Sequence, residues 1–158
     1  MSHTFTPTDE SYMRIALEEA HRAAEEGDVP VGAILVQNAT GEVLARGRNT
    51  REVMKTALGH AEINVISDAC AVLGNWRLED CTLYVTLEPC PMCAGAILHA
   101  RIPRIVCGAM DPVAGAMGSI WVLHRHPIEN KHVKLESGCL EEECKALLQD
   151  FFRSRRES

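Results

Sequence analysis

One histidine and two cysteines stand in this chain at spacings typical of a metal site. They are His60, in a His-Ala-Glu tripeptide, and Cys90 and Cys93, in a Pro-Cys-Pro-Met-Cys segment. Three protein ligands leave open one of the four positions that zinc usually fills, and an open position can hold a catalytic water. We therefore expect a catalytic metal site here rather than a closed structural one.

Glu62 lies beside His60 and is our candidate for moving a proton. Zinc lowers the pKa of bound water toward about 7, so that hydroxide becomes available as a nucleophile at neutral pH. General acid–base help from a carboxylate contributes typically about 10²–10⁴-fold. Beyond the first turn of a helix, a spacing of two would put His60 and Glu62 on opposite faces. We therefore expect a helix to begin at His60, which the preceding Leu58 and Gly59 permit.

Each part of this pattern alone has a more ordinary explanation. A lone His60 would more often be structural, and a lone C-x-x-C would more often be half of a structural zinc site or a redox pair. A second C-x-x-C for a four-sulfur site is missing from the sequence. Taken together, the residues read H-x-E … P-C-x-x-C, which is the known signature of zinc nucleobase deaminases. We interpret His124, His126 and His132 as surface histidines around Pro127.

The apolar pattern predicts helices and strands in alternation, which suggests a three-layer α/β arrangement. Strands are expected over residues 31–36, 43–45, 82–87, 102–107 and 132–136, and a loop over 49–59. The first helix is expected to be capped by Thr8 or Asp9 and to stop at Gly27. Two further helices are expected from His60 and from Pro91, and a last one has an apolar face. The apolar face expected for the helix from His60 consists of Ile63, Ile66, Cys70 and Leu73. The apolar face expected for the last helix consists of Leu140, Cys144, Leu147, Leu148 and Phe151.

The composition predicts one cytoplasmic domain over residues 1–158. Apolar residues make up 46% of the chain, but no stretch approaches the roughly 18 apolar residues of a membrane span. The seven cysteines are an odd number and follow no signal sequence, so we expect reduced thiols rather than disulfides. The net charge of −6 predicts that any contact with nucleic acid is local and depends on a few cations.

Four stretches besides the metal motif resemble the cytidine/deoxycytidylate deaminase superfamily and, within it, the bacterial tRNA adenosine deaminases. These stretches span residues 29–33, 83–90, 92–96 and 150–153. The Phe-Phe-Arg at 151–153 is more similar to the tRNA enzymes than to guanine or cytosine deaminases. The resemblance implies a cytidine-deaminase-like fold, with a five-stranded mixed sheet flanked by helices. It also implies one catalytic zinc per subunit, a homodimer, and conversion of wobble adenosine to inosine in the tRNA anticodon loop.

The same resemblance assigns roles to matching positions. His60, Cys90 and Cys93 would bind zinc, and Glu62 would be catalytic. The resemblance implies that Asn49 and the backbone N–H of Ala61 contact the base, and that Val29 and Leu87 form apolar walls of the pocket. It implies that Asp111 lies near the sugar of a neighbouring nucleotide. The anticodon loop would be contacted by Phe151, Phe152 and Arg153.

Two other functions stay open on the sequence. The acidic charge, and Met110 and Val113 where the family usually has basic residues, favour a deaminase of a free nucleobase or nucleoside. A zinc-stabilised RNA-binding module without catalysis would need a closed zinc shell, and the sequence offers no evident fourth ligand.

Overall fold

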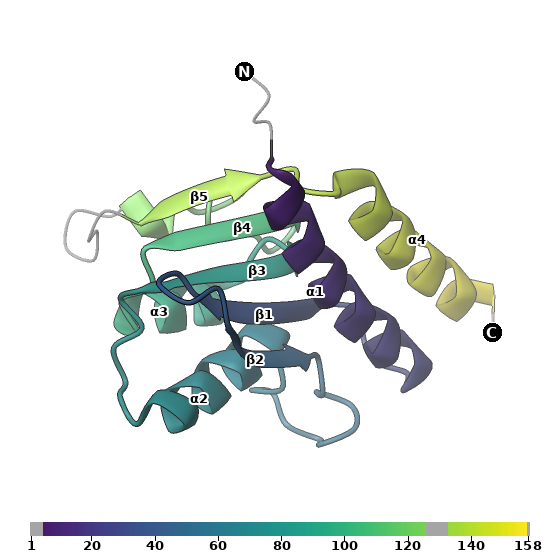
Figure 1. Ribbon diagram of the computed structural model, residues 1–158. Helices are drawn as coiled ribbons and strands as arrows, with labels where there is room; N and C mark the ends of the chain where they lie inside the picture. The colour runs from purple at the N-terminus through teal and green to yellow at the C-terminus, as the bar shows by residue number, and fades with distance from the viewer. Residues whose placement is uncertain (1–4, 126–132, 158) are drawn as a thin grey trace.

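Helices and strands alternate along the chain in the computed structural model, which describes residues 5–125 and 133–157 (Figure 1). The predicted α/β class with five strands is confirmed. In chain order the elements are α1 (Pro7–Glu25), β1 (Gly32–Gln37), β2 (Val43–Arg48), α2 (Ala61–Leu73), β3 (Cys81–Leu87), α3 (Pro91–His99), β4 (Arg104–Ala109), the 3₁₀ turn η1 (Leu123–Arg125), β5 (Lys134–Ser137) and α4 (Glu141–Glu157).

The five strands form one mixed sheet in the order β2-β1-β3-β4-β5. β1 pairs antiparallel with β2 and β3, while β3, β4 and β5 run parallel. Side chains alternate along β1, so that Ala33 and Leu35 join the core under α2 and α3, while Ile34 and Val36 join the core under α1 and α4. The molecule therefore has three layers, with a pair of helices on each face of the sheet (Figure 1).

α1 begins two residues earlier than the sequence predicts. The helix is capped by Thr6, whose hydroxyl accepts the backbone N–H of Asp9 at 3.0 Å, and not by Thr8 or Asp9. Pro7 follows the cap, where its missing N–H costs nothing and its fixed φ suits a helix. Further along, the helix lies directly on β1, because a Cβ at Gly32 would come within 1.9 Å of the carbonyl oxygen of Ala16.

α2 packs through a different face from the one predicted. Ala61, Val65 and Ala69 are fully buried, whereas Ile66 and Cys70 are half-buried and Leu73 is 36% exposed. Small residues form the buried face because α2 lies very close to β2: a Cβ at Gly47 would be 3.0 Å from Cγ2 of Val65. The helix ends at Gly74 as predicted, in the left-handed conformation with φ of 64°.

His124 is buried with 5% exposure, so its interpretation as a surface residue is wrong; His126 and His132 lie outside the described residues. All seven cysteines are free. In the part of the chain that the structure describes, we find no helix long and apolar enough to cross a membrane.

Candidate active site

The predicted metal ligands meet where α2 and α3 begin. His60 is the N-cap of α2, Cys90 is the N-cap of α3, and Cys93 lies in the first turn of α3. Nδ1 of His60 is 3.6 Å from Sγ of Cys90 and 3.5 Å from Sγ of Cys93. Nitrogen and sulfur ligands of one tetrahedral zinc-sized ion would be about 3.6 Å apart, given metal bonds of roughly 2.05 and 2.3 Å. The three side chains could therefore hold a metal ion with little movement.

The pKa values of the two thiols are shifted in opposite directions. A hydrogen bond from Cys93, helped by His60, lowers the pKa of Cys90 to about 4. The same hydrogen bond, together with burial, raises the pKa of Cys93. One sulfur is thus already a thiolate at neutral pH, which is the form that binds metals.

Glu62 is a buried carboxyl group at the start of α2. Its exposed fraction is 4%, and burial raises its pKa to about 7, against an opposing hydrogen bond from its own backbone N–H. A carboxyl group with a pKa near neutrality can both accept and donate a proton at physiological pH. His60 and Glu62 both lie at the helix start, as their spacing requires.

A cavity of about 180 Å³ opens over these groups. Four of the predicted substrate contacts line it beside His60, Glu62 and Cys90, namely Val29, Asn49, Leu87 and Asp111. Ala61 is fully buried, and its backbone N–H donates to Oδ1 of Asn49 at 2.9 Å. The Ala61 N–H predicted to meet a base is therefore engaged by Asn49 in this structure.

A second, more apolar cavity of about 530 Å³ continues from the first toward α4. Phe152 lines it and is 44% exposed. The predicted contacts Phe151 and Arg153 do not line either cavity: the guanidinium of Arg155 lies 4.7 Å from the ring centre of Phe151, and Arg153 pairs with Asp150 at 2.6 Å. The structure thus brings Phe152 to the site and places its two neighbours elsewhere on α4.

Sequence reasoning missed four residues that line the smaller cavity: Val31, Arg51, Glu88 and Ala114. Arg51 lies in a loop that is fixed by tertiary contacts, because Oδ2 of Asp28 accepts the backbone N–H of Glu52 at 3.0 Å. Glu88 is 2% exposed and holds the loop after β4, accepting the backbone N–H of Asp111 at 2.9 Å and that of Met117 at 3.0 Å. For Arg51, the one hint in the sequence was Gly59, because a glycine can mark a place where another part of the backbone passes close by. A Cβ at Gly59 would be 2.7 Å from the backbone nitrogen of Arg51.

A His-Cys-Cys group beside a buried glutamate, at two helix starts of a three-layer α/β fold, is the arrangement of the nucleobase deaminase class. The sequence profile of the MafB19-like deaminases matches residues 8–156. The chain therefore belongs to the MafB19-like deaminase family. It is also similar over most of its length to proteins named tRNA-specific adenosine deaminase.

Three relatives illustrate the similarity. A tRNA-specific adenosine deaminase of Bacillus subtilis (strain 168) is 50% identical over 148 residues, or 94% of this chain and 91% of the relative. A structure from work on A-to-I editing by tRNA:A34 deaminases at the wobble position of transfer RNA has a TM-score of 0.83 at 43% identity, covering 87% of this chain and 99% of that one. A guanine deaminase from Nitrosomonas europaea has a TM-score of 0.77 at 25% identity, covering 94% of this chain and 85% of that one.

Proposed function

We propose that this protein is a zinc-dependent deaminase that converts adenosine to inosine at the wobble position of tRNA. The observation that carries the proposal is the His60, Cys90 and Cys93 group beside buried Glu62, in a chain 50% identical to a tRNA-specific adenosine deaminase. In the reaction, the oxygen of water adds to C6 of adenine, the bond between C6 and the exocyclic amino nitrogen breaks, and ammonia leaves.

His60, Cys90 and Cys93 are the residues that would hold one zinc ion per subunit. Bound there, zinc supplies hydroxide at neutral pH by lowering the pKa of water. Glu62 would take one proton of the attacking water and deliver it to the ring nitrogen of the base. It would then carry the second proton from the added oxygen to the exocyclic amine, which leaves as ammonia. The burial of Glu62 keeps bulk water from competing for these protons.

The cavity walls would hold the base. Val29 and Leu87 would contribute apolar surface against the base, while Asn49 would offer an amide for its polar edge. An anticodon loop suits this arrangement, because its bases are already unstacked and one can be extruded into a pocket. Ala61 would act indirectly, because its backbone N–H holds Oδ1 of Asn49. Asp111 lines both cavities, and a sugar next to the base would pass it there.

We assign the rest of the anticodon loop to α4, where Phe152 lines the larger cavity. Phe151 and Arg153 would contact the loop from positions on α4 outside both cavities. Arg51 lines the smaller cavity and Lys145, paired with Glu141 at 3.1 Å, lines the larger one. These two cations would contact phosphates in place of the basic residues missing at Met110 and Val113. By its resemblance to the family, we further propose a cytoplasmic homodimer in which residues 1–158 form one domain.

The deciding experiment incubates zinc-loaded protein with an anticodon stem-loop that carries a wobble adenosine, and measures inosine by mass spectrometry. Ammonia release from free guanine, adenosine and cytosine is measured in parallel. Inosine at the wobble base with silent small molecules would support tRNA editing. A silent stem-loop with ammonia from free guanine would refute it and favour the activity of the 25% identical guanine deaminase instead.

A further inference from the structure

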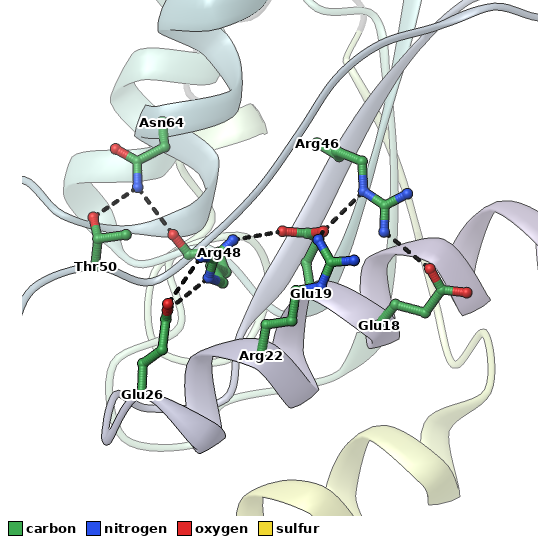
Figure 2. A network of polar contacts seen from close by, with 8 residues as sticks. All are labelled: Glu18, Glu19, Arg22, Glu26, Arg46, Arg48, Thr50 and Asn64. Atoms are coloured by element: carbon green, nitrogen blue, oxygen red, sulfur yellow. Dashed lines mark hydrogen bonds and ion pairs between the residues drawn. The ribbon is translucent and has the colours of Figure 1, made fainter. Parts of the chain in front are cut away.

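Asn64 holds the chain on both sides of Asn49. Its Nδ2 donates to the carbonyl oxygen of Arg48 at 2.9 Å and to Oγ1 of Thr50 at 3.0 Å (Figure 2). Between these two anchors lies Asn49, whose own Oδ1 accepts the N–H of Ala61 at 2.9 Å. Three hydrogen bonds therefore join residues 48–50 to the start of α2.

The same helix start carries the catalytic group. The backbone N–H of Asn64 donates to the carbonyl oxygen of His60 at 3.0 Å, so Asn64 lies one turn after that metal ligand. Asn64, His60 and Glu62 therefore move together as parts of one helix start. If Asn49 moved away from Asn64, it would also move away from His60 and Glu62. The distance between the base-binding amide and the reacting groups is set through this contact.

The strand on the other side of the contact is braced by α1. The guanidinium of Arg48 binds both oxygens of Glu26 at 2.7 and 3.0 Å and Glu19 at 3.1 Å (Figure 2). Glu19 is 1% exposed and also pairs with Arg46 at 2.8 Å and Arg22 at 3.0 Å. Two-point binding by a guanidinium fixes geometry as well as adding energy, so the Arg48 carbonyl is a firm anchor for Asn64.

The residue type is explained by these contacts and not by the helix. Asparagine is a poorer helix former than leucine or alanine, because its amide competes for backbone hydrogen bonds. The amide NH₂ carries two donors on one atom, so it can bond a carbonyl and a hydroxyl at once. Its short reach suffices because Gly47 lets β2 and α2 approach, its absent Cβ lying 3.6 Å from the Cβ of Asn64.

We propose that Asn64 is a positioning residue for the deamination proposed above, fixing the Asn49 amide relative to His60 and Glu62. The assignment rests on that proposed function, and Asn64 itself touches neither the base nor the metal. A displacement of about 1 Å in a positioning group can cost about 10²-fold in rate.

The test compares inosine formation by zinc-loaded wild type, Asn64→Leu, Asn64→Asp, Asn49→Ala and the double variant Asn49→Ala/Asn64→Leu. Leucine removes both donors at similar volume, and aspartate removes them at the same shape if the leucine variant does not fold. The control is Ser67→Ala, an exposed position one turn further along α2. Zinc content and melting temperature are measured for each protein.

The expected result is a loss of roughly 10–100-fold in kcat/KM for the Asn64 variants, with zinc retained, and less than a twofold change for Ser67→Ala. Because Asn64 acts through Asn49, the double variant should be no slower than Asn49→Ala alone. Asn64 variants within twofold of wild type, or a double variant slowed by the product of the single effects, would overturn the assignment. A wild type silent on the stem-loop would refute the proposed function, and the same variants would then be compared on the base that releases ammonia.

Discussion

Replacing Glu88 by glutamine should lower the free energy of unfolding by about 2–4 kcal/mol. One carboxylate oxygen accepts the N–H groups of Met117 and Ser119, both at 3.0 Å, and the other accepts the N–H of Asp111 at 2.9 Å and the Ser119 hydroxyl. A glutamine would keep its oxygen toward the two backbone N–H groups and turn its NH₂ toward Asp111 and Ser119. The hydroxyl can then rotate to accept, but the Asp111 N–H is left facing another donor.

The magnitude follows from these four bonds. A hydrogen bond to a charged group is worth about 1.5–3 kcal/mol, so the lost Asp111 bond costs about that amount. The bonds that remain weaken by up to about 1 kcal/mol each when the charge is removed. The smaller cost of burying a neutral amide offsets part of this loss, which leaves a net loss of about 2–4 kcal/mol.

Calorimetry on the zinc-loaded proteins would measure the effect. For a chain of this size each 1 kcal/mol lowers the melting temperature by about 2–4 °C, so Glu88→Gln should melt roughly 5–15 °C below wild type. The matched control is Glu79→Gln, whose side chain is 66% exposed and lies 4.0 Å from Arg77, and which should melt within about 2 °C of wild type. A Glu88→Gln protein as stable as this control would refute the argument that the carboxylate anchors the loop.

Three further changes have outcomes that the structure fixes. Glu62→Gln should keep the metal and slow turnover by at least about 10²–10⁴-fold, measured as inosine formation beside zinc analysis; normal turnover would contradict its proton-transfer role. Gly59→Ala should cost about 1–3 kcal/mol or more in urea unfolding, because the new Cβ would meet backbone 2.7 Å away; an unchanged midpoint would argue against this close contact. Asp9→Asn should weaken the dependence of stability on acid: burial raises the pKa of Asp9, but hydrogen bonds from Arg104 and Tyr84 outweigh burial and hold it below 3.8. A lowered carboxyl pKa stabilises the fold above about pH 4 and loses that effect as the pH falls, so the difference in stability between the two proteins should be largest at neutral pH and shrink as the pH falls below about 4; parallel stability curves would contradict this.

The grouping of the candidate metal ligands could be predicted because each motif is local. His60 with Glu62, and Cys90 with Cys93, need only a helix start at each motif, and both helix starts are as the sequence indicates. The three central strands could be predicted for a similar reason, since β1, β3 and β4 are mainly apolar and are buried over almost their whole length.

The cavity walls could not be predicted in the same way, because they depend on contacts between distant segments. Arg51 lines the cavity from a loop in which the N–H of Glu52 is held by Asp28, a residue that follows α1. Glu88 directly follows β3 and lines the cavity while it holds the loop after β4 through the N–H of Asp111. Periodicity placed Phe151 on the apolar face of the last helix and left Phe152 off it, yet Phe152 is the one that lines a cavity, while the guanidinium of Arg155 lies over the ring of Phe151.

The two outer strands of the sheet affect how the protein behaves in concentrated solution. An unpaired strand edge exposes N–H and C=O groups on which another chain can add a strand and begin to aggregate. β2 forms one edge and carries Arg46 and Arg48, which are held in place by the carboxylates of α1 (Figure 2). β5 forms the other edge with only 4 residues, and the side chain of its Lys134 is 70% exposed. The ion pairs that hold Arg48, and through it Asn64, therefore also keep charged side chains on β2, whose outer edge is unpaired in the sheet. These charges discourage edge-to-edge association between copies.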